Sequence, residues 1–152
     1  MERILGIDYG DKRVGVAVSD LLGFTSHGVG TIENNGLNTL VRKLESIINE
    51  YKPKKIVVGM PLNMDGTRGF RADATDKFIS SLSEVYNGEI VTWDERLTTM
   101  GASRFLNETN TRGKKRKGVI DTVSACIILD SYLTSAKNCW QRLTYNIKYI
   151  KK

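Results

Sequence analysis

Short runs of aliphatic and β-branched residues near the N-terminus predict three successive strands. Residues 3–8 (RILGID) and 14–19 (VGVAVS) are separated by Tyr-Gly-Asp-Lys-Arg, a composition typical of a hairpin turn. The glycine-rich segment 23–33 follows, and we expect it to form a third strand at the edge of a sheet. The chain therefore opens with strands joined by hairpin connections.

The pattern then alternates between helical and strand periodicity. Apolar residues recur at three- and four-residue spacing from 37 to 48, which predicts an amphipathic helix that ends at Tyr51-Lys52-Pro53. A buried strand is expected at 55–59, followed by a polar loop at 63–72 and a helix with Phe78, Ile79, Leu82 and Val85 on one face. A strand at 89–93 and a helix that ends near Asn107 come next. The last two elements are a segment without apolar residues at 109–118 and the most hydrophobic helix of the chain at 119–136.

The element order β-β-β-α-β-α-β-α-α predicts an α/β fold: a mixed five-stranded sheet with helices on both faces. Right-handed crossovers place the fourth strand beside the first, in the order 3-2-1-4-5. We expect one domain over residues 1–136, with residues 137–152 as its basic, aromatic C-terminal extension. That extension fits a helix or an alternating strand, and it either packs on the domain or stacks on single-stranded nucleotides.

The composition indicates a self-sufficient intracellular domain. The chain has 152 residues, 40% of them hydrophobic and 26% charged, which is enough for one core. Two cysteines, Cys126 and Cys139, cannot form a disulfide framework, so we expect free thiols in a reducing cytoplasm. The chain turns polar at Asp8, too early for a signal peptide, and no apolar run approaches the roughly 18 residues of a membrane span. We therefore expect a cytoplasmic protein with no membrane partner.

Several kinds of catalytic site are excluded by the residue types. One histidine and two cysteines disfavour a four-ligand zinc site. The sequence contains neither a P-loop motif nor a nucleophile-elbow motif. Carboxylates remain as the candidates for catalysis, and their oxygens suit Mg²⁺ or Mn²⁺.

The net charge of +6 is concentrated near the C-terminus. Residues 1–111 carry 13 Lys/Arg and 15 Asp/Glu, whereas residues 112–152 carry 10 and 2. Such asymmetry indicates a polyanionic partner, because cations placed on phosphates release counterions, although a solvated basic face would have the same composition. We expect the basic run before Asp121 to contact backbone phosphates through Arg112, Lys114, Lys115, Arg116 and Lys117.

Three acidic residues stand at the ends of predicted elements. Asp8 interrupts an apolar strand, where a metal ion would compensate its charge, unless it caps its own hairpin turn. Glu95 follows the strand at 89–93, and Asp121 lies in the first turn of the last helix, where the helix dipole alone also favours an anion. Because strand ends converge on one crevice of an α/β sheet, we expect the three to meet and to bind one or two divalent ions for phosphodiester hydrolysis.

Four motifs, in order, resemble the YqgF/RuvX family of small bacterial proteins, which have an RNase H-like fold akin to the RuvC Holliday-junction resolvases. The motifs are Gly6-Ile-Asp-Tyr-Gly with Arg13-Val-Gly-Val-Ala-Val-Ser-Asp20, Val58-Gly-Met-Pro-Leu-Asn-Met-Asp-Gly-Thr67 with Arg71-Ala72, Asp94-Glu-Arg-Leu-Thr-Thr99, and Ile120-Asp121 before Cys126-Ile-Ile-Leu129. Gly69-Phe70 departs from the Gly-Pro that is usual in the family, and we expect this to change only the stiffness of the loop.

The resemblance implies a metal-dependent nuclease, with Mg²⁺ or Mn²⁺ as cofactor, that matures the 5′ end of the 16S ribosomal RNA precursor. Resolution of branched DNA is the alternative, and the protein would be a monomer or a homodimer. The same resemblance implies Asp8, Glu95 and Asp121 as catalytic metal ligands. Besides the basic run, contacts with nucleic acid are expected from Lys12, Arg13, Asn63, Arg68, Arg71, Arg96 and Thr98.

Two alternatives come from other functional classes. An Asp-x-Gly motif before a hairpin, here Asp8-Tyr9-Gly10, also opens the phosphate site of the sugar-kinase, actin and Hsp70 ATPase group. Those proteins need a second lobe, which 152 residues cannot supply. A nucleic-acid-binding adaptor without turnover would keep the same fold, and it is excluded if Asp8→Asn abolishes a metal-dependent cleavage and leaves binding intact.

Overall fold

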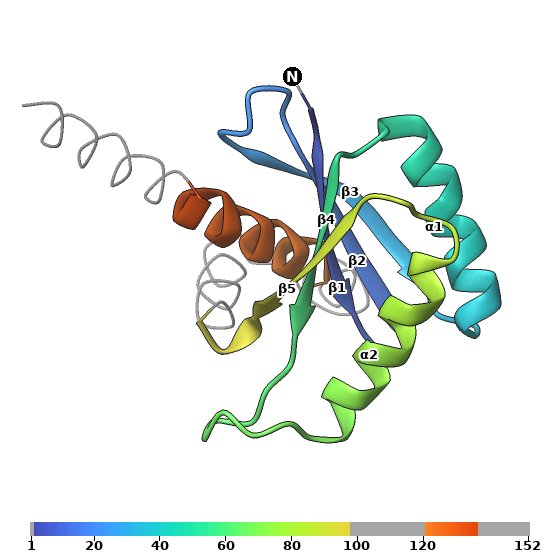
Figure 1. The fold of residues 1–152 in the computed structure, drawn as a ribbon, viewed down its shortest axis with the longest axis vertical. Helices are drawn as coiled ribbons and strands as arrows, with labels where there is room; N and C mark the ends of the chain where they lie inside the picture. Colours follow the sequence, from blue (N-terminus) through green and yellow to red (C-terminus); the bar gives the residue numbers. More distant parts are fainter. Residues whose placement is uncertain (1, 98–120, 137–152) are drawn as a thin grey trace, which may run out of the picture.

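The computed structural model describes residues 2–97 and 121–136 (Figure 1). Within them, five strands form one sheet in the order β3-β2-β1-β4-β5, and helices lie on both of its faces. The predicted α/β architecture and strand order are therefore confirmed. The elements are β1 (Ile4–Tyr9), β2 (Arg13–Ser19), β3 (Ser26–Glu33), α1 (Leu37–Tyr51), β4 (Lys55–Met60), α2 (Phe70–Ser83), β5 (Glu89–Asp94), a single 3₁₀ turn (Glu95–Leu97) and a helical stretch at 121–136.

The sheet is mixed because hairpins and crossovers both contribute to it. β1 pairs antiparallel with β2, and β2 pairs antiparallel with β3. β4 pairs parallel with β1 on one side and with β5 on the other. The carboxyl ends of β1, β4 and β5 therefore lie at the same edge of the sheet, as expected for a crevice that gathers functional residues.

One face of the sheet is covered by α1 and α2 (Figure 1). Leu5 and Ile7 of β1 pack there with Leu44 of α1 and Phe78 of α2, all with no exposed surface. Helix α2 begins at Phe70, so the predicted loop at 63–72 is three residues too long at its end. The first turn is helical because its Ala72 is fully buried, which makes that turn part of the core.

The helical stretch 121–136 covers the opposite face (Figure 1). Its Ala125, Ile128, Leu129 and Leu133 are buried, and they pack in one cluster with side chains of β2 and β4. The backbone of this stretch lies very close to β2, because a Cβ added to Gly15 of β2 would overlap the backbone carbonyl of residue 121. The glycine therefore allows the start of this stretch to lie directly on the sheet, beside the end of β1.

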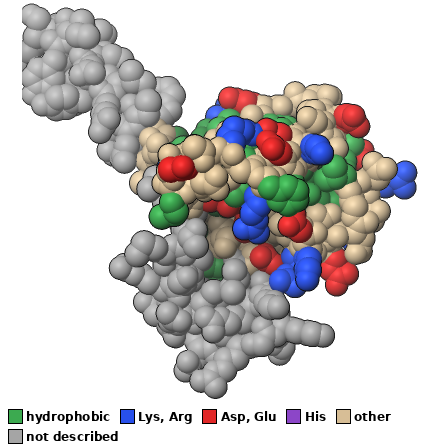
Figure 2. Space-filling model, turned by 90° about the horizontal axis from the view of Figure 1, so that it is seen from below, with side chains coloured by type: hydrophobic (Ala, Val, Ile, Leu, Met, Phe, Trp, Pro, Cys, Tyr) green, Lys and Arg blue, Asp and Glu red, His purple; other side chains and the backbone are tan. Residues whose placement is uncertain are grey.

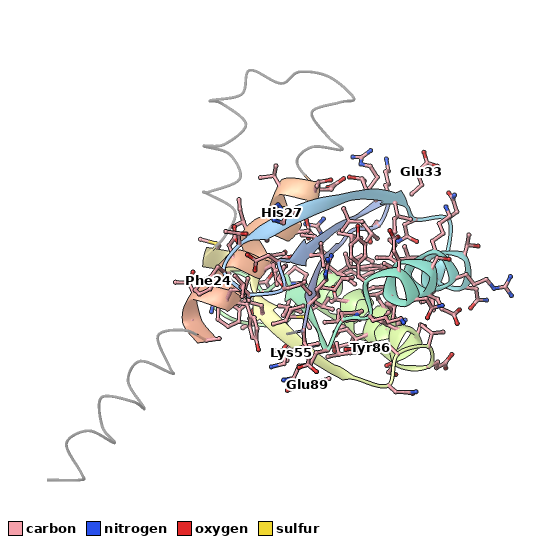
Figure 3. All side chains as sticks on the ribbon, turned by 90° about the horizontal axis from the view of Figure 1, so that it is seen from above. Phe24, His27, Glu33, Lys55, Tyr86 and Glu89 are labelled. Carbon is pink, nitrogen blue, oxygen red and sulfur yellow. The ribbon has the colours of Figure 1, made fainter. Side chains whose placement is uncertain are left out.

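The starts of β4 and β5 form the other edge of the sheet, and it is held by polar contacts (Figure 3). The ammonium of Lys55 lies 3.4 Å from the carboxylate of Glu89 and donates a hydrogen bond of 2.7 Å to the hydroxyl of Tyr132. The buried Tyr86 donates a hydrogen bond of 2.9 Å to the backbone carbonyl of Pro53. The side chains at the amino ends of β4 and β5 thus hold the fold together, whereas the candidate functional residues lie at the carboxyl ends of the strands.

Several predicted segments lie outside the described residues: most of the helix expected to end near Asn107, the segment 109–118 and the extension 137–152. In the part of the chain that the structure does describe, no helix combines the length and the apolar character needed to cross a membrane.

Candidate active site

Asp8 and Glu95 meet at the carboxyl ends of their strands. Along β1, Leu5 and Ile7 face the helices α1 and α2, so Gly6 and Asp8 face the stretch 121–136 by strand alternation. Glu95 follows β5 directly. When Asp8 is protonated, its carboxyl group donates a hydrogen bond to the carboxylate of Glu95. The two residues that the sequence placed at strand ends are thus brought together.

Gly59 of β4 makes this contact feasible, because β4 lies between β1 and β5. A Cβ added at Gly59 would collide with the Oε1 atom of Glu95 and would lie 2.6 Å from the side chain of Ile128. The missing side chain therefore leaves the space through which Glu95 reaches Asp8. Sequence reasoning overlooked Gly59, although a glycine inside an otherwise apolar strand often indicates a close approach by another group.

The proximity of the two carboxyls changes their chemistry. Burial, followed by the charge and hydrogen bond of Glu95, raises the pKa of Asp8 from 3.8 to about 9. The charge of Asp121 raises it further, and the guanidinium of Arg71 acts in the opposite direction. Without a cation, Asp8 therefore keeps its proton at neutral pH, directed toward the neighbouring carboxylate of Glu95.

Asp121 lies beside this pair but is engaged elsewhere. Its Oδ2 atom accepts a hydrogen bond of 2.9 Å from Nε of Arg13, the first residue of β2. Among the described residues, the three carboxylates do not form a ready-made cluster of metal ligands. Asp121 is nevertheless close enough for its charge to raise the pKa of Asp8.

These residues fit a hard divalent cation. All the donors are carboxylate oxygens, which Mg²⁺ and Mn²⁺ prefer. The proton held by Asp8 marks a point where negative charge is concentrated, and a cation would replace that proton. Asp121 could join as a third ligand by leaving Arg13.

The carboxylates line a cavity of about 230 Å³. A second hollow of about 270 Å³ lies next to it, and Arg71 and Asp121 line both. Acidic and basic side chains are interspersed on this end of the molecule (Figure 2). The residues around the first cavity are Asp8, Tyr9, Gly10, Asp11, Pro61, Arg71, Thr75, Glu95, Asp121 and Ser124.

Two of the residues expected to bind nucleic acid are placed at these hollows with no ion pair to another described side chain. Arg71 is exposed at the start of α2 and borders both hollows. Lys12 is exposed in the turn between β1 and β2 and lines the second. Thr75 also lines the first cavity, but its hydroxyl donates a hydrogen bond to the backbone carbonyl of Arg71, so it supports the helix.

Four of the other expected contacts bind groups of the protein itself. Arg13 binds Asp121, as described above, and Arg68 forms an ion pair with Asp76 of α2. Arg96 is paired with Asp94 at 2.6 Å. The amide of Asn63 donates a hydrogen bond to the hydroxyl of Thr67 within their own loop. Six expected contacts lie outside the described residues: Thr98, Arg112, Lys114, Lys115, Arg116 and Lys117.

Comparison with known proteins gives consistent results. A family model described as "RuvX: Holliday junction resolvase" matches residues 2–135. A protein of Ruminiclostridium cellulolyticum named "Putative pre-16S rRNA nuclease" is 48% identical over 132 residues, covering 86% of this chain and 93% of that protein. One of Clostridium tetani with the same name is 44% identical over 136 residues, covering 90% of this chain and 99% of that protein.

Two solved structures show the same fold at low sequence identity. RuvC of Thermus thermophilus, in complex with a Holliday junction substrate, has a TM-score of 0.60 at 10% identity, covering 90% of this chain and 96% of that chain. The Holliday junction resolvase of fowlpox virus has a TM-score of 0.54 at 14% identity, covering 88% of this chain and 99% of that chain. The RNase H-like architecture expected from the sequence is thereby confirmed.

Proposed function

Because this chain belongs to the RuvX family, we propose that it is a divalent-metal-dependent nuclease that hydrolyses phosphodiester bonds in the precursor of 16S ribosomal RNA. The observation that carries the proposal is the hydrogen-bonded carboxyl pair of Asp8 and Glu95, which lines a cavity together with Asp121 and Arg71. The choice of substrate follows the name carried by relatives 44–48% identical to this chain. We also propose that the protein acts in the bacterial cytoplasm, because the relatives named for the ribosomal RNA precursor are bacterial proteins.

Asp8 and Glu95 would hold the cation, with Asp121 as the neighbouring carboxylate, and we propose Mg²⁺ or Mn²⁺ from the all-oxygen donor set. When bound, such an ion neutralises the carboxylates and stabilises negative charge that develops on the phosphodiester. Asp8 must release its proton for this to occur, so loading is favoured by rising pH.

Cationic side chains at the hollows would orient the substrate. Arg71 projects from the first turn of α2 beside the carboxylates, where its guanidinium can bind a phosphate oxygen. Lys12 lies at the second hollow and can bind a neighbouring phosphate. Arg13 has a different role, because it holds the carboxylate of Asp121 on the sheet side of the site.

A four-way DNA junction is the second candidate substrate, because the matching family model is described as a Holliday junction resolvase. The same carboxylates would hydrolyse either phosphodiester backbone. The two candidates therefore differ only in the nucleic acid that is bound.

The test is a cleavage assay with Mg²⁺ or Mn²⁺. It compares an RNA that spans the 5′ end of 16S rRNA in its precursor with a four-way DNA junction and with single-stranded DNA. Asp8→Asn and Glu95→Gln remove the proposed ligands, and Asp130→Asn is the matched control, because it neutralises an exposed carboxylate of the stretch 121–136. We expect metal-dependent RNA cleavage that both ligand variants abolish and the control retains.

Other outcomes assign the function differently. Cleavage of the junction alone would move the substrate to branched DNA and keep the site. Cleavage that persists in both ligand variants would refute the site. Binding of RNA without cleavage of any substrate would identify the protein as an adaptor.

A further inference from the structure

Two large hydrophobic side chains are exposed beside the carboxylate cavity. The described residues contain five exposed large hydrophobics, and three of them lie in the turn between β2 and β3. The other two are Met64, which is 91% exposed, and Phe70, which is 79% exposed. Large apolar side chains held exposed at the rim of a functional cavity are candidates for contact with a ligand.

The loop that carries them is ordered by its own hydrogen bonds. The backbone N–H of Asn63 donates to the carbonyl of Thr67 at 2.9 Å, and the amide of Asn63 donates to the hydroxyl of Thr67 at the same distance. Leu62 and Arg68 form an isolated bridge that closes the loop. The exposure of Met64 and Phe70 is therefore a property of a defined loop and helix start.

Both side chains line a hollow of about 470 Å³. This hollow shares Pro61 and Arg71 with the carboxylate cavity, so the two are direct neighbours. A strand whose phosphate lies at the carboxylates and Arg71 would place an adjoining nucleotide against Phe70. Charge also favours a phosphate at Arg71, because Arg71 has no ion pair among the described residues. The nearby Arg68, in contrast, is neutralised by Asp76.

We propose that Phe70, with Met64 beside it, forms a stacking platform for an unpaired nucleobase of the substrate, next to the phosphate bound at the carboxylates. This inference rests on the proposed nuclease function. An aromatic ring accepts any base, because every base has a π-face, whereas bases inside a duplex are already stacked on both faces. The platform therefore selects single-stranded over double-stranded nucleic acid.

Phe70 stands where the family usually has proline, an exchange that the sequence predicts to change only the stiffness of the loop. The proposed platform would give this exchange a second consequence. In the structure Phe70 is the first residue of α2, and its ring adds aromatic surface at the rim of the site.

The test measures binding to a single-stranded RNA that carries 2-aminopurine, whose fluorescence is quenched by stacking. All variants are made in the Asp8→Asn background, so that the RNA is not cut. Phe70→Ala removes the ring, Phe70→Trp keeps an aromatic face, and Phe24→Ala is the control. Phe24 is 61% exposed and lies in the turn before β3, close to His27 (Figure 3). That turn is at the amino end of β1, whereas Phe70 follows the carboxyl end of β4.

We expect Phe70→Ala to weaken single-strand affinity roughly 5- to 100-fold and to remove the quenching. Affinity for a duplex of the same sequence should change little. Phe70→Trp should bind the single strand as the parent does, and Phe24→Ala should leave both affinities unchanged. Unaltered melting temperatures would show that each variant is folded.

The result that overturns the platform is a Phe70→Ala protein with the parent's single-strand affinity and quenching, or one that loses single-strand and duplex affinity equally. Its failure can be told apart from failure of the proposed function. Metal-dependent cleavage with no effect of Phe70 would refute the platform alone. Phe70-dependent binding by a protein that cuts nothing would refute the nuclease alone, and absence of all nucleic-acid binding would refute both.

Discussion

Replacing Asp8 by asparagine should stabilise the metal-free protein even though it removes a proposed catalytic ligand. In the folded protein Asp8 keeps its proton up to about pH 9, whereas the unfolded chain releases it near pH 3.8. The contribution of protonated Asp8 to the free energy of unfolding is therefore fully present below pH 3.8. It is lost progressively as the pH rises from 3.8 to about 9. Asparagine resembles the protonated acid in shape and can donate a hydrogen bond to Glu95, but it carries no charge to lose.

The size of the effect follows from the same shift. At about pH 7.5, the difference in the pKa of Asp8 between the folded and unfolded states sets an upper limit of about 5 kcal/mol. Asp8 is only half-buried, so water screens part of this penalty, and we expect Asp8→Asn to gain about 1–3 kcal/mol. For a chain of this length, such a gain raises the melting temperature by roughly 3–9 °C.

The assay is thermal unfolding in EDTA at several pH values between 4 and 9, with Asp130→Asn as the control for loss of an exposed carboxylate. The advantage of Asp8→Asn should grow as the pH rises, while the control should follow the parent protein. In a matched buffer without EDTA, added Mn²⁺ should stabilise the parent and not Asp8→Asn, because only the parent retains the carboxyl pair. An Asp8→Asn protein that is less stable than its parent at pH 7.5, or an advantage that does not vary with pH, would refute the reasoning.

Three further substitutions probe the surroundings of this pair. Gly59→Ala should displace Glu95, which should lower the free energy of unfolding by about 1–3 kcal/mol and the initial rate of cleavage by roughly 100-fold. Wild-type values of both quantities would show that Glu95 does not need the space over Gly59. Arg13→Gln should free Asp121 for the cation and tighten Mn²⁺ binding about 2- to 5-fold in calorimetry, whereas weaker binding would show that the ion pair helps to build the site. Tyr86→Phe should cost about 1–2 kcal/mol of unfolding free energy, since a buried carbonyl loses its donor, and should leave cleavage unchanged; a loss of activity would contradict its purely structural assignment.

Most of the fold could be predicted because its elements follow local periodicity. The helix expected from the apolar spacing at 37–48, with its end at Tyr51-Lys52-Pro53, is observed as α1 from Leu37 to Tyr51. The start of α2 was misplaced because the chain before it is polar and glycine-bearing. The burial of Ala72 that makes this turn helical arises from tertiary packing, which no local pattern contains.

The candidate site was predictable only in part. Asp8 and Glu95 were identified because carboxylates at the ends of parallel strands converge, and their contact is observed. The ion pair between Arg13 and Asp121 joins residues 108 positions apart, so no sequence spacing indicates it. The space that Gly59 leaves for the side chain of Glu95 likewise depends on the order of strands in the sheet. It could be inferred only from the position of β4 between β1 and β5.

The central claim is that Asp8 and Glu95 exchange the proton of Asp8 for a divalent cation. Calorimetric titration of Mn²⁺ near pH 7.5, in two buffers that differ in ionisation enthalpy, measures that exchange directly. The account predicts release of about one proton for each ion bound, with no binding at this site in Asp8→Asn. Binding of Mn²⁺ without proton release, or with the same affinity in Asp8→Asn, would contradict it.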